Sequence, residues 1–170
     1  FTLPANVFRG MIRRTVFATD IESTRYALGG ILLEFSPEKA TLAATDSRRL
    51  AVVHAACQCV GECNLESAKP VVPAKAMQLI ERSLPDSEDE AQIAIHENDV
   101  VVKCGGSTIY SRLVEGRFPR YAEVIPNDFK ATVELVVTQF YSAVRQAQIV
   151  TSEESRGVDF QFSTGKLALT

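Results

Sequence analysis

The 170-residue sequence contains no Trp, two His, two Met and four Cys, and its uninterrupted apolar runs are only a few residues long. A helix needs about 20 apolar residues to cross a bilayer, so we expect no membrane-spanning segment. Four cysteines are too few for the disulfide framework of a secreted protein, and this length can bury a core of its own. These shortages predict an intracellular, cytoplasmic protein, and 23% charged residues without a repetitive polar tract argue against general disorder.

Positive charge is also scarce. The chain carries 18 Lys and Arg against 21 Asp and Glu, a formal net charge of −3. Binding of nucleic acid is driven by local neutralisation of phosphates. Bulk basicity is therefore excluded as a way of holding nucleic acid, and any polyanionic partner must meet a locally basic surface.

The few Cys and His residues do not form a recognisable catalytic or metal centre. His54, Cys57, Cys59 and Cys63 are four zinc-ligating side chains, but their C-x-C-x3-C spacing lacks the C-x2-C knuckle of structural zinc sites. His96 has no Ser or Cys nucleophile at an interpretable spacing. We expect reduced thiols, no metal and no cofactor. A hydrolase or metal-dependent enzyme is the alternative, and bound zinc at a stoichiometric level would favour it.

Hydrophobic periodicity predicts both helices and strands. Apolar residues recur with the 3.6-residue period of an amphipathic helix over Asn6–Thr19, Pro73–Leu84 and Thr138–Val150. Alternating or continuous apolar segments separated by turn residues predict antiparallel strands. The predicted strands are Tyr26–Phe35, Ala40–Ala44, Arg49–Ala55, Ser67–Val72, Ala91–His96, Val100–Cys104 and Thr108–Leu113.

The pattern repeats along the chain. Up to Pro126 it is a strand, a helix and three strands, written twice, and Pro4-Ala5 before the first helix returns as Pro73-Ala74 before the second. A further copy begins after Asn127, which predicts a complete domain at 1–126, an incomplete one at 127–170, and a fragment excised from a longer protein. The residues that recur in this copy are Phe8, Arg13, Thr19 and Ser23, as Phe140, Arg145, Thr151 and Ser155.

Each predicted helix carries basic or amide side chains opposite its apolar stripe. On a single helix these would be an ordinary solvated face. Three equivalent helices in a symmetric array would instead pool their charge into a basic lining suited to phosphate contacts without base reading. The residues are Arg9, Arg13, Arg14, Lys75, Gln78, Arg82 and Arg145.

Three separated stretches resemble a known family. They are Thr45–Val52 (TDSRRLAV), Leu113–Tyr121 (LVEGRFPRY) and Ser155–Val158 (SRGV). Their patterns are similar to those of the bacterial DNA polymerase III β subunit, the β sliding clamp family, and the resemblance covers the middle domain and the start of the third. It implies an α+β DNA clamp fold of duplicated strand-helix-three-strand units, with antiparallel sheets outside and helices lining the inner face.

The resemblance also implies a non-catalytic function. Members of the family form head-to-tail homodimeric rings that encircle duplex DNA without sequence specificity and act as processivity factors for the polymerase. A ring held by topology needs only weak phosphate contacts, so a net acidic protein is acceptable. For DNA contact the resemblance points to the helix residues above and to the loop pair Arg25 and Tyr26. A protein-interaction scaffold of the same fold without DNA binding is the alternative, and loading onto nicked circular DNA separates the two.

Partner docking is the second implied property. In the family, a cleft between the middle and third domains binds short linear motifs from the polymerase III α subunit, the clamp loader and repair proteins. This sequence departs from the common pattern at Ser47-Arg48, where many members have Gly followed by a smaller or aromatic residue. The matching positions are Leu28, Thr45, Ser47, Arg48, Arg49, Leu50, Pro119 and Val124.

Overall fold

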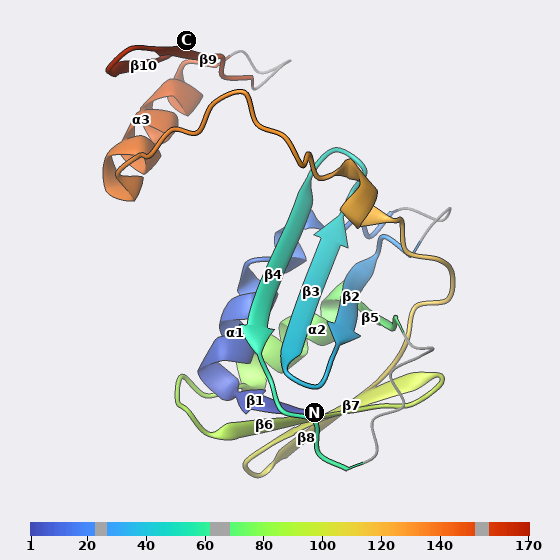
Figure 1. Ribbon diagram of the computed structural model, residues 1–170. Helices are drawn as coiled ribbons and strands as arrows, with labels where there is room; N and C mark the ends of the chain where they lie inside the picture. Colours follow the sequence, from blue (N-terminus) through green and yellow to red (C-terminus); the bar gives the residue numbers. More distant parts are fainter. Residues whose placement is uncertain (23–26, 62–68, 152–156) are drawn as a thin grey trace. The chain divides into compact units, whose positions relative to one another are not determined.

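Figure 1 shows the computed structural model of the chain, which describes residues 1–22, 27–61, 69–151 and 157–170. The chain divides into two compact units, Phe1–Ile125 and Pro126–Thr170. Each unit is described by itself. The assignment of 1–126 as a complete middle domain and 127–170 as the start of a third stays a prediction.

In its described residues the first unit contains two four-stranded antiparallel sheets and two α-helices, and these elements follow the predicted order of strand, helix and three strands, twice. The sheet orders are β1-β6-β7-β8 and β4-β3-β2-β5. The first half comprises β1 (Thr2–Pro4), α1 (Ala5–Arg13), β2 (Gly30–Phe35), β3 (Lys39–Thr45) and β4 (Leu50–Ala56). The second comprises β5 (Val71–Pro73), α2 (Ala74–Ser83), β6 (Glu90–Ile95), β7 (Asp99–Cys104) and β8 (Ser107–Arg112).

Each half lends its first strand to the sheet of the other half. β1 pairs with β6, with Leu3 opposite Ala91, and β5 pairs with β2, with Val72 opposite Ile31. The two halves therefore cannot separate without breaking both ladders. The repeated order predicted a first strand but gave it no residue range, because three residues are too few to show a strand period.

The core lies between the helices and the two sheets. α1 and α2 lie side by side (Figure 1) and bury Phe8, Ile12, Met77 and Ile80 in one cluster with side chains from both sheets. Both helices begin directly after a proline, and Pro4 and Pro73 have φ values of −59° and −52°. The fixed φ of proline suits this position at the start of a helix. The predicted stripes of these two helices are thus confirmed in part, because Val7, Phe17 and Leu79, which also belong to them, are 37%, 56% and 54% exposed.

The end of the first helix differs from the prediction. α1 ends at Arg13 rather than at Thr19, and a short 3₁₀ helix follows at Val16–Ala18. Between them the buried Thr15 hydroxyl donates to the backbone oxygens of Met11 and Ile12 at 2.9 and 3.1 Å. Such side-chain bonds to the last helical carbonyls compete with continuation of the helix.

Two predicted strands are shorter in the structure. The strand expected over Tyr26–Phe35 begins only at Gly30, and position 26 lies outside the described residues. Of the strand expected over Ser67–Val72, only Val71 and Val72 are paired as strand, while positions 67 and 68 are outside the described residues. Periodicity marks apolar positions but does not show where a ladder partner begins.

The second unit is a helix and a hairpin. α3 spans Val137–Ile149, and β9 (Phe160–Ser163) pairs antiparallel with β10 (Lys166–Leu169). The rings of Phe140 and Phe160 approach with centroids 5.9 Å apart. The third helix is therefore present close to its predicted bounds, Thr138–Val150.

Candidate functional site

The outward side of α1 and α2 carries the predicted basic residues. The helices bury their opposite sides against the sheets, so the exposed side chains face solvent on the side of the helices away from the sheets. Together we call them the cationic helix surface, formed by Arg13 and Arg14 of α1 and Lys75, Gln78 and Arg82 of α2.

An acidic residue of α2 joins the two helices. The Glu81 carboxylate pairs with Arg9 Nε at 3.4 Å and with Arg13 Nε at 2.5 Å. The hydrogen bond from Arg13 is the main cause that holds the pKa of Glu81 below its ordinary value. Arg9 is only 24% exposed and also lies 3.8 Å from Asp86. Part of the predicted charge is therefore neutralised within the protein.

The other cations of this surface are not neutralised in that way. Within the ranges that the structure describes, Arg14, Lys75 and Arg82 form no ion pair. The surface keeps a net positive charge on a chain whose total charge is negative. This is the locally basic region that the composition requires of any binder of polyanions.

Three further predicted DNA-contacting residues lie outside the described part of this unit. Arg25 and Tyr26 lie outside the described residues. Arg145 belongs to α3 in the second unit, where its guanidinium lies 5.9 Å from the centroid of the Tyr141 ring.

Most of the predicted partner-binding residues line one cavity. This cavity, which we call the β3–β4 pocket, has a volume of about 660 Å³ and lies beside the turn between β3 and β4. Leu28 is not part of its lining and is buried, with 3% of its surface exposed. The predicted residues that line the pocket are Thr45, Ser47, Arg48, Arg49, Leu50, Pro119 and Val124.

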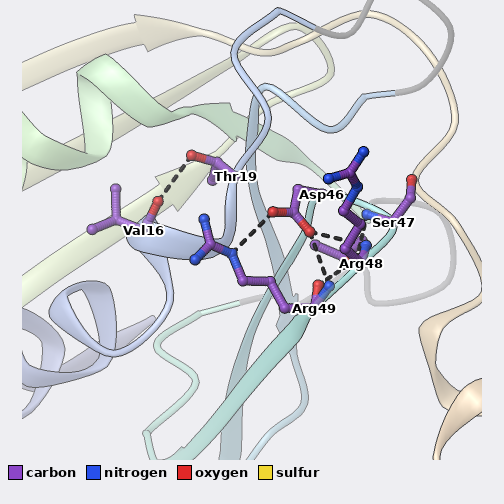
Figure 2. A network of polar contacts seen from close by, with 7 residues as sticks. Val16, Thr19, Asp46, Ser47, Arg48 and Arg49 are labelled. Carbon is purple, nitrogen blue, oxygen red and sulfur yellow. Dashed lines mark hydrogen bonds and ion pairs between the residues drawn. The ribbon is translucent and has the colours of Figure 1, made fainter. Parts of the chain in front are cut away.

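A polar network fixes the turn at the edge of the pocket (Figure 2). Asp46 Oδ1 accepts hydrogen bonds from the backbone N–H groups of Arg48 and Arg49 at 3.0 and 2.9 Å, and Asp46 Oδ2 accepts one from Arg49 Nε at 2.9 Å. The bonds from the two backbone N–H groups are the main reason why the pKa of Asp46 lies below its ordinary value. The Thr45 hydroxyl donates to the backbone oxygen of Arg49 and accepts from the N–H of Ser47.

Ser47 has a backbone conformation that is uncommon for a residue other than glycine. Its φ is 72°, in the left-handed region that favours glycine. The turn therefore requires a conformation that glycine adopts most readily, and Ser47 adopts it within the network around Asp46. The neighbouring Arg48 extends from this turn.

The opposite wall of the pocket comes from the segment after β8. Phe118 packs in a small second cluster with Leu32, Ala43 and Val71, on the face of the β4-β3-β2-β5 sheet that is turned away from the helices. A short 3₁₀ helix, Tyr121–Val124, follows and brings Val124 to the pocket with 70% of its surface exposed. An exposed apolar side chain beside a cavity is typical of a binding site.

A partly buried hydrogen bond anchors this wall to the sheet. The Tyr121 hydroxyl donates to Glu34 Oε2 at 2.5 Å, and Lys69 Nζ pairs with Glu34 Oε1 at 2.7 Å. Burial tends to raise the pKa of Glu34, but the hydrogen bonds from Lys69 and Tyr121 outweigh it and the pKa is lowered. Burial, together with the bond to Glu34, raises the pKa of Tyr121 above its ordinary value of 10.0.

Sequence reasoning did not assign several residues of these two sites. Glu81 gave no signal because its role depends on packing between α1 and α2. The other missed residues fall within or next to the LVEGRFPRY stretch, which was the available signal. They are Arg117, Phe118, Arg120, Tyr121 and Glu123.

The cysteines differ in part from the expectation of reduced thiols. Cys57 and Cys104 are free and buried, and burial raises the pKa of both thiols. Cys59 is disulfide-bonded, so the expectation is wrong there, and Cys63 lies outside the described residues.

Over the described ranges, the structure contains no group of three or more His, Cys, Asp or Glu side chains placed to hold a metal ion. The helices described are also too short or too polar to cross a membrane.

Comparisons with known proteins agree with the resemblance. Residues 2–120 match the family model described as DNA polymerase III beta subunit, central domain. The whole chain is 32% identical to the beta sliding clamp of Chlamydia pneumoniae and 31% identical to that of Escherichia coli K12, and in each case it covers 45% of the relative. The chain thus spans less than half the length of these relatives.

Solved structures give the same result. The sliding clamp from Pseudomonas aeruginosa matches 99% of this chain with a TM-score of 0.85 and 28% identity, and the match covers 46% of that protein. A clamp from Bacillus subtilis matches with a TM-score of 0.84 and 25% identity over 99% of this chain and 44% of its own. The predicted α+β clamp fold is confirmed.

Proposed function

Because the chain belongs to the DNA polymerase III β subunit family, we propose that it is part of a non-catalytic sliding clamp. The complete protein would be a cytoplasmic homodimeric ring that encircles duplex DNA without sequence specificity and tethers the replicative polymerase. Residues 1–126 would form its middle domain and 127–170 the start of its third.

The cationic helix surface is the observation that carries the DNA-binding part of this proposal. Arg14, Lys75 and Arg82 lie on two adjacent helices and form no ion pair within the described part of the chain. Cations spread along helices suit backbone phosphates rather than base edges. Weak contacts of this kind permit sliding, because a topological link, rather than affinity, prevents escape.

Reversal of charge on this surface tests the proposal. In the full-length protein, Arg13→Glu combined with Arg82→Glu is expected to shorten retention on nicked circular DNA. It should also reduce the slope of log affinity against log salt by about 0.9 per lost phosphate contact. Retention would be measured after loading, by gel filtration of the clamp–DNA complex over a salt series.

Lys103→Glu is the matched control. Lys103 is exposed on β7 and alternates with the buried Val102 and Cys104, so it points away from the side of the sheet that the helices cover. Retention should be unchanged in this variant. If the Arg13/Arg82 variant is retained as well as the control, the cationic helix surface does not contact DNA, and the scaffold without DNA binding becomes the better account.

Partner docking at the β3–β4 pocket is the second part of the proposal. An apolar floor formed by Leu50, Phe118 and Pro119, with the exposed Val124 beside it, offers anchoring positions for the side chains of an extended peptide. By the family resemblance, the partners are the polymerase III α subunit, the clamp loader and repair proteins, each through a short linear motif. Leu50→Ala is expected to weaken binding of such a peptide, as measured by fluorescence anisotropy.

A further inference from the structure

The β3–β4 pocket combines its apolar floor with an excess of positive charge. One carboxylate, Glu123, belongs to the lining, and it is paired with Arg120 Nη1 at 3.2 Å. Nothing else in the lining is acidic. The cations of the lining are Arg48, Arg49, Arg117 and Arg120.

Two of these cations are occupied and two are not. Arg49 is engaged by Asp46, and its guanidinium lies 5.6 Å from the centroid of the Phe17 ring. Arg120 is engaged by Glu123. Across the residues that the structure describes, Arg48 and Arg117 form no ion pair. The pocket therefore has two positive charges that no protein carboxylate balances.

The turn keeps Arg48 separate from the acidic group nearest to it in sequence. Asp46 accepts hydrogen bonds from the backbone N–H groups of Arg48 and Arg49 and from the Arg49 side chain. Figure 2 shows the guanidinium groups of Arg48 and Arg49 extending in different directions, with only that of Arg49 directed at Asp46. The Asp46 carboxylate is thus committed to the turn, and the Arg48 guanidinium remains available to a ligand.

We propose that the pocket selects peptides in which an apolar anchor is flanked by Asp or Glu, with Arg48 and Arg117 as specificity-determining residues. This inference rests on the proposed docking function and adds the charge of the partner. Carboxylates match the donor geometry of guanidinium groups, and the apolar anchor matches the floor. Nucleic acid would satisfy the arginines but would leave Val124 and Leu50 without an apolar partner.

The test compares peptides that differ only in charge. Three synthetic peptides share one Leu- and Phe-containing anchor and carry Glu, Gln or Lys on both sides of it. Binding to the full-length protein is measured by fluorescence anisotropy at low and high salt. The Glu peptide is expected to bind about fivefold more tightly than the Gln peptide, from two partly exposed ion pairs. The Lys peptide should bind most weakly, and added salt should reduce the differences.

Variants separate charge selection from docking itself. Arg48→Gln combined with Arg117→Gln is expected to remove the preference, so that the Glu and Gln peptides bind this variant equally, and measurable binding of the Gln peptide shows that the pocket remains folded. Arg112→Gln is the control, because Arg112 is exposed on β8 and lines a different cavity. This control should retain the preference.

Each other outcome has a definite meaning. Equal affinities for the Glu and Gln peptides in the unmodified protein would overturn the inference and leave docking intact. Absence of binding by all three peptides would refute the docking function itself. Displacement of the Glu peptide by a short duplex DNA from a site that requires Arg48 and Arg117 would show that the pocket is a nucleic-acid site and would overturn the inference.

Discussion

At the scale of single residues, Glu81 is the main counterion of the cationic helix surface. It pairs with both Arg9 and Arg13, so part of the positive charge of α1 is satisfied by α2 before any ligand arrives. Its pKa is lowered, which keeps the carboxylate ionised at neutral pH. The pairing thus limits the charge that this surface can offer to phosphates, which agrees with the proposed sliding on DNA.

Replacement of Glu81 should therefore strengthen DNA binding. In Glu81→Gln, Arg9 and Arg13 lose their carboxylate partner, and the slope of log affinity against log salt should become steeper by about 0.9 for each additional phosphate contact. The measurement is anisotropy of labelled duplex DNA with the full-length protein over a salt series. Glu38→Gln, on the exposed turn between β2 and β3, is the control. Unchanged or weaker binding in Glu81→Gln would contradict the assignment.

Tyr121 is the residue through which the pocket wall is held on the sheet. Tyr121→Phe removes the donor to Glu34, whose side chain is 25% exposed and still paired with Lys69. The free energy of unfolding at neutral pH should fall by about 1 kcal/mol. Urea unfolding measures the change. Tyr110→Phe is the control, because Tyr110 is 60% exposed.

The same tyrosine predicts a pH dependence. Its pKa is raised above 10.0 in the folded protein, so above pH 10.0 the unfolded chain loses this proton while the folded chain retains it. Deprotonation therefore favours unfolding, and the free energy of unfolding should decrease as the pH rises above 10.0. This decrease should be smaller in Tyr121→Phe than in the unmodified chain. If the free energy of unfolding falls equally steeply with pH in the two proteins, the prediction for Tyr121 is wrong.

At the scale of secondary-structure elements, the exchange of first strands places β5 close against β2. A Cβ atom added to Gly30 would lie 2.3 Å from the backbone oxygen of Val72. Gly30→Ala must therefore push β5 away from β2, and because β5 leads directly into α2, the displacement reaches the core. The expected loss in free energy of unfolding is about 1–3 kcal/mol.

Gly10→Ala is the matched control for this substitution. Gly10 lies within α1, and a Cβ atom there meets nothing within 4 Å. Alanine should stabilise the helix at this position by about 1 kcal/mol. In urea unfolding, the free energy of unfolding is expected to fall in Gly30→Ala and to rise in Gly10→Ala. A neutral Gly30→Ala would show that the β2–β5 ladder adjusts without cost.

The sequence alone predicted some boundaries of the helices and strands and not others. The 3.6-residue stripes placed α2 to within a residue at each end, and the repeated Pro-Ala marked the start of both helices. The end of α1 was not predictable, because it depends on a hydroxyl of Thr15 that turns back onto the helix. The repeated order included a strand before each helix, but β1 received no residue range and β5 is shorter than predicted, since strands of three residues are defined by their partners in the other half rather than by their own pattern.

The two sites also differed in how well the sequence predicted their residues. The β3–β4 pocket was largely predictable because its residues fall in two short motifs, and a motif keeps its residues together. Leu28 matched by position but is buried away from the lining. The pairing of Glu81 with α1 joins residues 68 and 72 positions apart, and no local pattern encodes a contact of that separation.

At the scale of the whole molecule, the distribution of charge matters more than its sum. The net charge is −3, yet the outward face of α1 and α2 is cationic and the β3–β4 pocket keeps two unbalanced arginines. A net acidic protein with these two positive regions suits weak, non-specific contact with DNA and selective contact with acidic peptides. Attraction of the whole protein to nucleic acid would explain neither the contact with DNA nor the contact with acidic peptides, because the net charge is negative.

Site-specific crosslinking tests the central claim most directly. A photoreactive residue replaces Arg82 on α2 in one full-length protein and Lys103 on β7 in another, and each protein is loaded onto circular duplex DNA and irradiated. The account predicts covalent DNA adducts from position 82 and few from position 103. Adducts of equal yield at both positions, or at position 103 alone, would contradict it.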